Sequence, residues 1–150
     1  MNNKILTKNE EETMNIAENF ETEKFAGMVI CLDGELGSGK TVFVKGFARG
    51  LGIDDAITSP TFNIIKEYDT GELPLYHMDV YRVSGETKSI GIEDYFNKNG
   101  ITIIEWSENI ADILPADRLD VKFSIVDENS RVIRFIPYGK QYEDLCNSVL

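Results

Sequence analysis

The sequence predicts an α/β domain with a mixed, mostly parallel β-sheet between layers of helices and with a β-hairpin near the C-terminus. Two short apolar runs, at residues 28–32 and 101–104, have the pattern of parallel strands that are buried on both faces. An alternating segment at 121–125, a turn at 127–130 and a further strand at 132–136 predict the hairpin. The 150 residues suit one core, so we expect residues 1–150 to form a single domain.

In the N-terminal third, the pattern predicts a helix on each side of the first buried strand. Residues 7–10, Thr-Lys-Asn-Glu, have the form of a capping box, so a helix is expected from there to about residue 25. The strand follows at 28–32. A second helix is expected at 40–51, because apolar residues recur there at helical spacing and Gly52 stands where a C-terminal cap belongs.

The middle of the chain is expected to add a hairpin and several short helices. Strands at 61–68 and 75–79 flank a turn-forming segment, Asp-Thr-Gly-Glu, at 69–72. Further helical pieces are expected after this hairpin, at residues 84–96, 107–114 and about 142–149.

Charge and composition exclude several classes of protein. The net charge is −11, with 15 Lys and Arg against 26 Asp and Glu. Because phosphate contacts by basic residues supply most of the affinity for nucleic acid, this balance argues against autonomous binding of tRNA or DNA. It does not exclude work in a nucleic-acid pathway beside a basic partner.

The sequence carries no signal for a membrane, for export or for zinc. No apolar run approaches the length that spans a bilayer, and the N-terminus lacks the apolar core of a signal peptide. One histidine and two cysteines offer no group with zinc-ligand spacing. We therefore expect a cytoplasmic protein that does not contact membranes.

The strongest motif lies between the first buried strand and the helix expected at 40–51. Residues 34–41 read Gly-Glu-Leu-Gly-Ser-Gly-Lys-Thr, which has the Gly-x-x-x-x-Gly-Lys-Thr spacing of a P-loop. In such a loop, backbone N–H groups point at phosphate oxygens, and the helix N-terminus adds the positive end of its dipole. The motif predicts a P-loop NTPase-like fold of three layers that binds ATP and Mg²⁺. The residues expected to bind the nucleotide there are Glu35, Leu36, Gly37, Ser38, Gly39, Lys40 and Thr41.

Within this motif, Lys40 is expected to reach the β- and γ-phosphates, and the Thr41 hydroxyl to bind Mg²⁺. A magnesium ion needs further oxygen ligands, and a carboxylate at the end of a neighbouring strand is a common one. Glu105 and Asp79 each end a predicted strand. Glu105 follows the more apolar strand, so we assign it to the metal and assign Asp79 to the attacking water. The exchanged roles, or a helix-capping or solvent-facing role for either acid, remain alternatives.

Three other residues have both a functional and a structural interpretation. Ser59, in a loop shaped by Pro60, is placed to sense the γ-phosphate, but it also fits an ordinary turn. Trp106 is suited to stacking on a base or anchoring a partner, and equally to the core. His77 lies within a predicted strand, where a packed, hydrogen-bonded histidine is the more common case.

Among nucleotide enzymes, the sequence favours ATP hydrolysis. Residues 97–100, Asn-Lys-Asn-Gly, lack the Asp of the guanine-specific element of GTPases and precede a strand instead of following one. A small P-loop kinase of a small-molecule metabolite is the second hypothesis. Such a kinase needs an arginine-rich lid, and this chain has only five arginines and no insertion long enough for a lid.

An ordered set of motifs resembles the bacterial TsaE family. Beside the P-loop at 34–41, the set comprises Thr-Ser-Pro-Thr-Phe at 58–62, Leu-Tyr-His-Met-Asp-Val-Tyr-Arg at 75–82, Gly-Ile-Glu-Asp-Tyr-Phe at 91–96 and Ile-Glu-Trp-Ser-Glu at 104–108. The resemblance implies an ATPase needed to form N6-threonylcarbamoyladenosine at position 37 of tRNA. It also implies that the protein works with the partner proteins TsaB and TsaD, which switch on its hydrolysis.

The resemblance implies Lys40 on phosphate, and Thr41 and Glu105 on Mg²⁺. It puts Asp79 in a position important for hydrolysis and Trp106 in one important for activity.

Near the start of the first predicted helix, Glu10 matches a region that lines the adenine site of the family. Ser107 departs from the family pattern, which often has Pro there, and this affects the turn after the tryptophan more than the chemistry. No activating arginine is evident in the sequence, so we expect hydrolysis to be weak without a partner, because a partner's arginine can supply orders of magnitude in rate.

Overall fold

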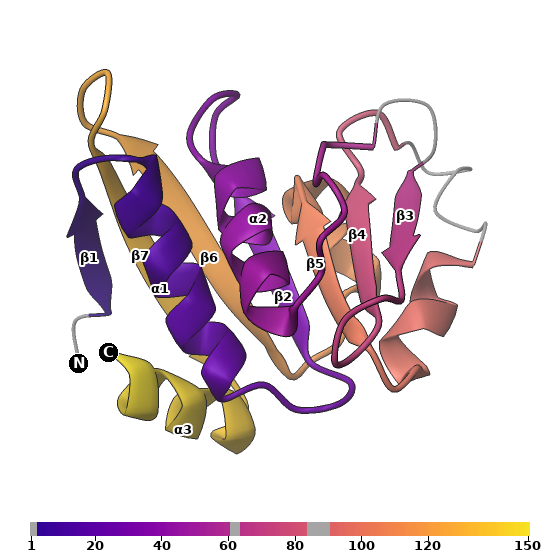
Figure 1. Ribbon diagram of the computed structural model, residues 1–150. Coiled ribbons are helices and arrows are strands. Elements are labelled where there is room, and N and C mark those ends of the chain that lie inside the picture. The colour runs from indigo at the N-terminus through magenta and orange to yellow at the C-terminus, as the bar shows by residue number, and fades with distance from the viewer. Residues whose placement is uncertain (1–2, 61–63, 84–90) are drawn as a thin grey trace.

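Figure 1 shows the computed structural model of the chain, which describes residues 3–60, 64–83 and 91–150. Within these residues, seven strands form one sheet in the order β1-β7-β6-β2-β5-β4-β3. The strands are β1 (Lys4–Thr7), β2 (Val29–Asp33), β3 (Ile65–Tyr68), β4 (Leu75–Asp79), β5 (Ile101–Glu105), β6 (Arg118–Ile125) and β7 (Arg131–Tyr138). The helices are α1 (Glu10–Thr22), α2 (Lys40–Leu51) and α3 (Lys140–Val149), with 3₁₀ segments η2 (Ile92–Asn97) and η3 (Ser107–Ile113).

The sheet confirms the α/β class, but its strands are less uniformly parallel than expected. The central strands β6, β2, β5 and β4 are parallel to one another. At the edges, β1 and β7 form antiparallel pairs with their neighbours, and so does β3. The expectation of a mostly parallel sheet is therefore correct only for its centre. Short turns connect β3 to β4 and β6 to β7 as hairpins, whereas β1 pairs with β7 from the other end of the chain and crossover connections build the centre.

Helical elements cover the two faces of the sheet to different extents. In Figure 1, α1 and α2 lie side by side in front of the sheet, and α3 lies below it. Alternate residues of β2 face opposite sides, so Ile30 and Leu32 pack with α1 and α2, whereas Val29 and Cys31 pack with η2 and η3. Among the described residues, the helical cover of the opposite face consists of short 3₁₀ segments.

One expected element differs in type from the structure, and two others lie partly outside the described residues. The helix expected at 107–114 forms as 3₁₀ turns, which are kinked at Ile110 because the backbone of that residue is not helical. Residues 61–63 of the strand expected at 61–68 lie outside the described residues, as do residues 84–90 of the helical pieces expected at 84–96. The helix α2, by contrast, has the expected bounds, and Gly52 caps it with a left-handed backbone (φ 82°).

The first helix begins later than its sequence pattern suggested. Thr7 belongs to β1, which was not expected, and its hydroxyl is hydrogen-bonded to that of Thr13. Asn9 is the cap instead, because its side-chain oxygen accepts from the Glu12 amide at 2.8 Å. The Glu12 carboxylate in turn accepts from the amide of Lys8 at 2.8 Å. The cap therefore lies two residues further on and resembles a capping box, except that the acid accepts from the amide before the cap and not from the amide of the cap itself.

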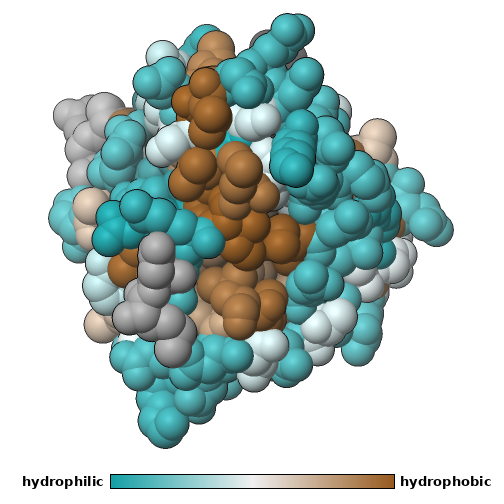
Figure 2. Space-filling view, turned by 90° about the vertical axis from the view of Figure 1, so that its left-hand side faces the viewer, coloured by the Kyte–Doolittle hydropathy of each residue, from teal (hydrophilic) through white to brown (hydrophobic). Residues whose placement is uncertain are grey.

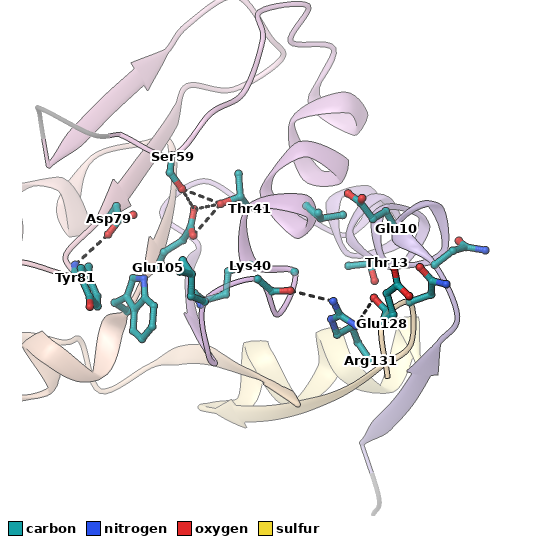
Figure 3. Close-up of a pocket in the computed structure, with 17 residues that line it drawn as sticks. Glu10, Thr13, Lys40, Thr41, Ser59, Asp79, Tyr81, Glu105, Glu128 and Arg131 are labelled. Atoms are coloured by element: carbon teal, nitrogen blue, oxygen red, sulfur yellow. Dashed lines mark hydrogen bonds between the residues drawn. The ribbon is translucent and has the colours of Figure 1, made fainter. Parts of the chain in front are cut away.

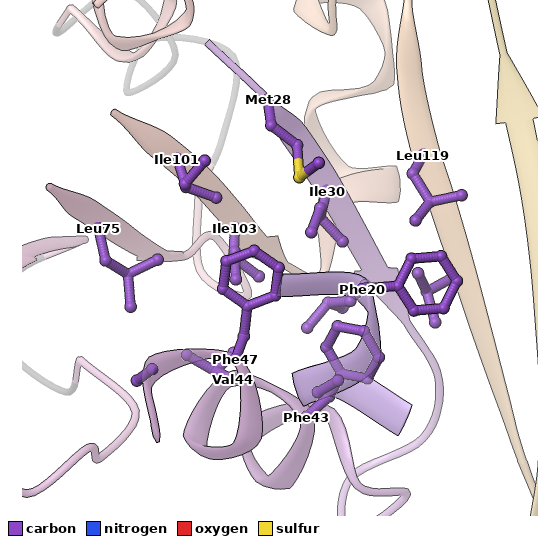
Figure 4. Close-up of a cluster of buried hydrophobic side chains, with 14 of the residues drawn as sticks. Phe20, Met28, Ile30, Phe43, Val44, Phe47, Leu75, Ile101, Ile103 and Leu119 are labelled. Atoms are coloured by element: carbon purple, nitrogen blue, oxygen red, sulfur yellow. The ribbon is translucent and has the colours of Figure 1, made fainter. Parts of the chain in front are cut away.

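The larger core lies between the sheet and the two front helices. Figure 4 shows Phe20 of α1 and Phe43, Val44 and Phe47 of α2 pointing toward apolar residues of β2, β4, β5 and β6. The Phe20 ring stacks on Phe135 of β7 with 4.7 Å between the ring centroids. Aromatic contacts thus join α1 to the antiparallel side of the sheet, while α2 covers the parallel centre.

We expect Phe20→Ala to lower the free energy of unfolding by about 3–5 kcal/mol, because it removes a fully buried ring and leaves a cavity. Urea denaturation measures this loss. Phe20→Leu is the matched control, which keeps most of the apolar volume. An alanine variant no less stable than the leucine variant would contradict this packing.

The edge of the sheet at β1 exposes several apolar side chains. Figure 2 faces this side of the molecule and shows apolar residues gathered at its centre. Exposed apolar side chains on the elements of this region include Leu6, Ile125 and Leu150.

Among the described residues, no helix is both long and apolar enough to cross a membrane.

Candidate functional site

The sequence-predicted residues meet at one edge of the sheet because three parallel strands end there. Glu105 is paired with Asp79 of β4 on one side and with Leu32 of β2 on the other. The glycine loop leaves β2 at the same edge, between Asp33 and the start of α2 at Lys40. A cavity of about 540 Å³ opens over this edge (Figure 3). The carboxyl ends of parallel strands are a common place for a ligand in such sheets.

Most of the residues predicted from the sequence line this cavity. They are Glu10, Leu36, Gly37, Gly39, Lys40, Thr41, Asp79, Glu105 and Trp106. Glu35 and Ser38 are not among its lining residues. The Glu35 side chain is exposed, whereas Ser38 is buried inside the loop.

Two glycines permit the shape of the loop. Gly39 has φ 109° immediately before α2, a left-handed backbone that side chains rarely adopt. A Cβ atom on Gly34 would lie 2.6 Å from the Ser38 hydroxyl and 2.9 Å from Phe123, so no side chain fits there. The loop thus closes tightly against β6 and directs the N-terminus of α2 at the cavity. The first amides of a helix have no partner within it, which makes this end a site for anions.

Lys40 is the cation at the floor of this loop. Its side chain is only 4% exposed, and its ammonium donates to the carbonyls of Gly34 and Glu35 at 2.5 and 3.0 Å. The same ammonium lies 4.0 Å from the centroid of the Trp106 ring. Burial lowers the pKa of Lys40, and the negative charge of Glu105 opposes this shift. The ammonium is therefore poorly solvated and lies within the glycine loop beside Trp106.

Beside the lysine, three oxygen-bearing side chains converge. The Thr41 hydroxyl lies 3.0 Å from both carboxylate oxygens of Glu105 and 2.8 Å from the Ser59 hydroxyl. Ser59 is also 3.4 Å from Glu105 Oε2. Hydroxyl and carboxylate oxygens are the ligands that Mg²⁺ prefers, and an ion bound to phosphates needs only one or two from the protein. The donor set therefore fits a magnesium ion.

The other acid, Asp79, lies next to Glu105 but in different surroundings. It is half-buried, and its Oδ1 atom accepts from the Tyr81 amide at 3.0 Å. Burial raises the pKa of Asp79, the Tyr81 hydrogen bond opposes this shift, and the charge of Glu105 adds to it. Asp79 thus lines the cavity as a carboxylate that binds protons more tightly than an ordinary aspartate.

Trp106 forms one wall of the cavity from a strained backbone position. It has φ 63°, which is rare for a residue other than glycine. The Tyr81 ring packs against the indole with 4.8 Å between the ring centroids. The residues that follow Trp106 are held by Asp33, whose carboxylate accepts from the Ser107 hydroxyl and the Glu108 amide. Backbone strain of this kind persists only where the surroundings hold it, and it is concentrated at functional sites.

Sequence reasoning missed the wall that faces α1. Besides Asn9 and Thr13, the cavity is lined by Glu128, Asn129 and Arg131 from the β6–β7 turn. The Arg131 guanidinium donates to the Gly37 carbonyl at 3.0 Å and so joins this turn to the glycine loop, as Figure 3 shows. Nothing local marks these residues, because the turn reaches the loop only through the pairing of β6 with β2.

Comparison with known proteins identifies relatives along nearly the whole chain. The family model "Threonylcarbamoyl adenosine biosynthesis protein TsaE" matches residues 7–133. A tRNA threonylcarbamoyladenosine biosynthesis protein TsaE from Bacillus subtilis (strain 168) is 46% identical over 143 residues, covering 95% of this chain and 90% of that protein. The protein of the same name from Nostoc sp. (strain PCC 7120) is 39% identical over 147 residues, with the same coverage.

A solved structure has the same fold. The crystal structure of Bacillus subtilis YdiB superposes with a TM-score of 0.83 and 43% sequence identity, covering 97% of this chain and 92% of that one. The match of the family model includes both the glycine loop and the turn between β6 and β7. The chain therefore belongs to the TsaE family.

Proposed function

We propose that this chain is a magnesium-dependent ATPase that serves tRNA threonylcarbamoyladenosine biosynthesis. Membership of the TsaE family carries the biosynthetic role. The observation that supports the chemistry best is the contact between the Thr41 hydroxyl and the Glu105 carboxylate beside the glycine loop. A hydroxyl at the start of α2 and an acid at the end of β5 offer a magnesium ion two protein oxygens next to the phosphates.

In this proposal, the residues of the chain divide into three tasks. The loop amides and the Lys40 ammonium bind the phosphates, and Trp106 closes the wall beside them. Thr41 and Glu105 hold the metal, which when bound would neutralise charge on the β- and γ-phosphate oxygens. Asp79 orients the attacking water and accepts its proton. The raised pKa of Asp79 suits it to this task, because a general base works best when its pKa approaches the working pH.

We further propose that TsaB and TsaD bind this protein and increase its rate of hydrolysis. Arg131 lines the cavity, but its described hydrogen bonds go to the Gly37 carbonyl and to carbonyls of its own turn. An arginine tethered in this way is poorly placed to follow charge as it develops on the γ-phosphate. A cation supplied by a partner can add about 10³–10⁵ in rate to nucleotide hydrolysis. The net charge of −11 favours a basic partner surface over tRNA itself.

The test is the release of phosphate from ATP, measured with and without purified TsaB and TsaD from the same source. We expect slow release from the chain alone and a rate at least about 10 times higher with both partners, since an added cation stabilises the transition state. Glu105→Gln is the control, and it should stay at background in both conditions. A rate that does not respond to the partners would refute their role, and no release in either condition would refute the ATPase.

A further inference from the structure

We propose that His77 is a positioning residue of the metal site, which holds the Glu105 carboxylate in the orientation that magnesium requires. The imidazole Nε2 atom lies 2.6 Å from Glu105 Oε2. This inference rests on the proposed function, because it takes Glu105 to be a ligand of the ion. His77 is not among the residues that line the cavity, so its effect on the ion passes through Glu105.

The register of the sheet brings the two side chains together. Asp79 pairs with Glu105, and two residues earlier His77 pairs with Ile103, so all four point to the face that α2 covers. His77 is 0% exposed and Glu105 is 2% exposed. The imidazole therefore lies beneath the carboxylate, between it and the core, and not beside it in the cavity.

The hydrogen bonding of the ring points to a task beyond packing. A carboxylate offers only acceptors, so His77 Nε2 is the donor in this contact. The other ring nitrogen, Nδ1, is buried and has no partner among the described residues. Burying an imidazole with one nitrogen unsatisfied costs free energy that an apolar side chain of similar size would not cost. Compared with an apolar side chain, the gain from a histidine at this position is therefore its hydrogen bond to Glu105.

The direction of each contact separates His77 from the other partners of Glu105. The Thr41 and Ser59 hydroxyls approach the carboxylate from the cavity, and both residues line it. An ion held by Thr41 and Glu105 would interact with them from this same cavity side. The hydrogen bond from His77 comes from the core side, so it remains when the ion binds. It holds one carboxylate oxygen from the side away from the cavity and so would fix the orientation of the group that faces Thr41.

Partners of this kind tune a metal site even though they do not touch the ion, and their loss typically costs about 10–100-fold in metal affinity or activity. Two variants separate the hydrogen bond from the mere presence of a polar side chain. In His77→Gln, the amide nitrogen occupies nearly the place of Nε2 and keeps the donor. In His77→Asn, the shorter amide reaches only the place of Nδ1, which has no partner to bind.

The readout is the free Mg²⁺ concentration at which the fluorescence of Trp106 has changed by half, with a non-hydrolysable ATP analogue in excess. Trp106 is the single tryptophan and lines the cavity, so its emission reports on this site. We expect the midpoint to rise about 10–100-fold in His77→Asn and to stay within about threefold of the parent in His77→Gln. In EDTA, both variants should bind the analogue as the parent does, because the loop amides and Lys40 do not touch His77.

Thr41→Ala and the parent chain distinguish failure of this inference from failure of the proposed function. Loss of the Mg²⁺ response in Thr41→Ala, together with a parent-like midpoint in His77→Asn, would overturn the inference alone. Equal shifts in His77→Gln and His77→Asn would also overturn it, since the donor would then not be the cause. A Thr41→Ala variant that responds to Mg²⁺ like the parent would overturn the metal site itself. Thermal melting followed by circular dichroism shows whether each variant is folded. If His77→Asn does not fold, His77→Leu takes its place, and its Mg²⁺ midpoint is expected to rise by the same factor.

Discussion

Lys40→Ala should weaken the binding of ATP by about 10- to 150-fold, the loss expected for about 1.5–3 kcal/mol of hydrogen bonding to a charged group. Hydrolysis by the bound fraction should fall by a further factor of about 10²–10³, because a preorganised donor to developing charge is lost. The physical reason is the burial of the ammonium. Its described hydrogen bonds go to two loop carbonyls, which are weaker partners than phosphate oxygens, and little water competes for it.

Calorimetric titration with a non-hydrolysable ATP analogue measures the affinity. Two further variants show which property of Lys40 matters. Lys40→Met keeps the aliphatic chain against Trp106 and should behave like the alanine variant, since the charge is absent from both. Lys45→Ala removes the same charge from an exposed position on the same helix and should bind like the parent. A Lys40→Ala variant with parent-like affinity would be incompatible with the loop as the phosphate site.

Asp79→Asn should lose hydrolysis by about 10²–10⁴-fold, the range for removing a general base, while its affinity for ATP stays within about threefold of the parent. The amide keeps the size of the carboxylate and still accepts the hydrogen bond from the Tyr81 amide. It cannot take a proton from water. Because the proposed mechanism assigns Asp79 to the attacking water and the loop to phosphate, binding and hydrolysis should separate in this variant and should fail together in Lys40→Ala.

The same substitution should not destabilise the protein at neutral pH. Burial raises the pKa of Asp79 in the folded chain, so the folded state binds this proton more tightly than the unfolded state does. As pH rises through the interval between the ordinary and the raised pKa, the ionised carboxylate costs stability. Asparagine has no such cost. The melting temperature of Asp79→Asn should therefore equal or exceed that of the parent above this interval, and the advantage should vanish below it.

Phosphate release, analogue titration and melting curves recorded across pH together test this prediction. In the parent, the acidic limb of the rate profile should lie above the ordinary pKa of an aspartate, since Asp79 must be ionised to accept a proton. A variant that hydrolyses ATP normally would remove Asp79 from the mechanism. Normal formation of the modified tRNA in cells with Asp79→Asn, but not in cells with Lys40→Ala, would point instead to a nucleotide-gated binding module.

The parts of the site that local sequence predicts are those in which neighbours in the chain are also neighbours in space. The glycine spacing before Lys40 and the cap at Gly52 predict α2 to the residue. The apolar runs before Asp79 and Glu105 predict two strand ends, and parallel pairing brings those ends together. Strand, loop and helix follow one another there without interruption, so hydrophobic period and backbone chemistry are sufficient.

The parts that local sequence does not predict depend on distant pairing. Arg131 reaches the glycine loop because β6 lies beside β2, and no pattern near residue 131 encodes that neighbour. Thr7 matched the start of a helix, but its backbone pairs with Arg131, so the strand β1 displaced the cap to Asn9. The antiparallel pairing of β1 with β7 arises in the same way, whereas the hairpins β3–β4 and β6–β7 were expected from the sequence.

By itself, the sequence determined the glycine loop, the two strand-end acids and the class of fold, because each is encoded by residues adjacent in the chain. Only the tertiary structure decided which walls enclose the cavity and what holds Glu105 from below. His77 illustrates the difference, since in the sequence it is an isolated histidine in a strand. Its role arises from strand register, which places its ring under a carboxylate that lies 28 positions further along the chain.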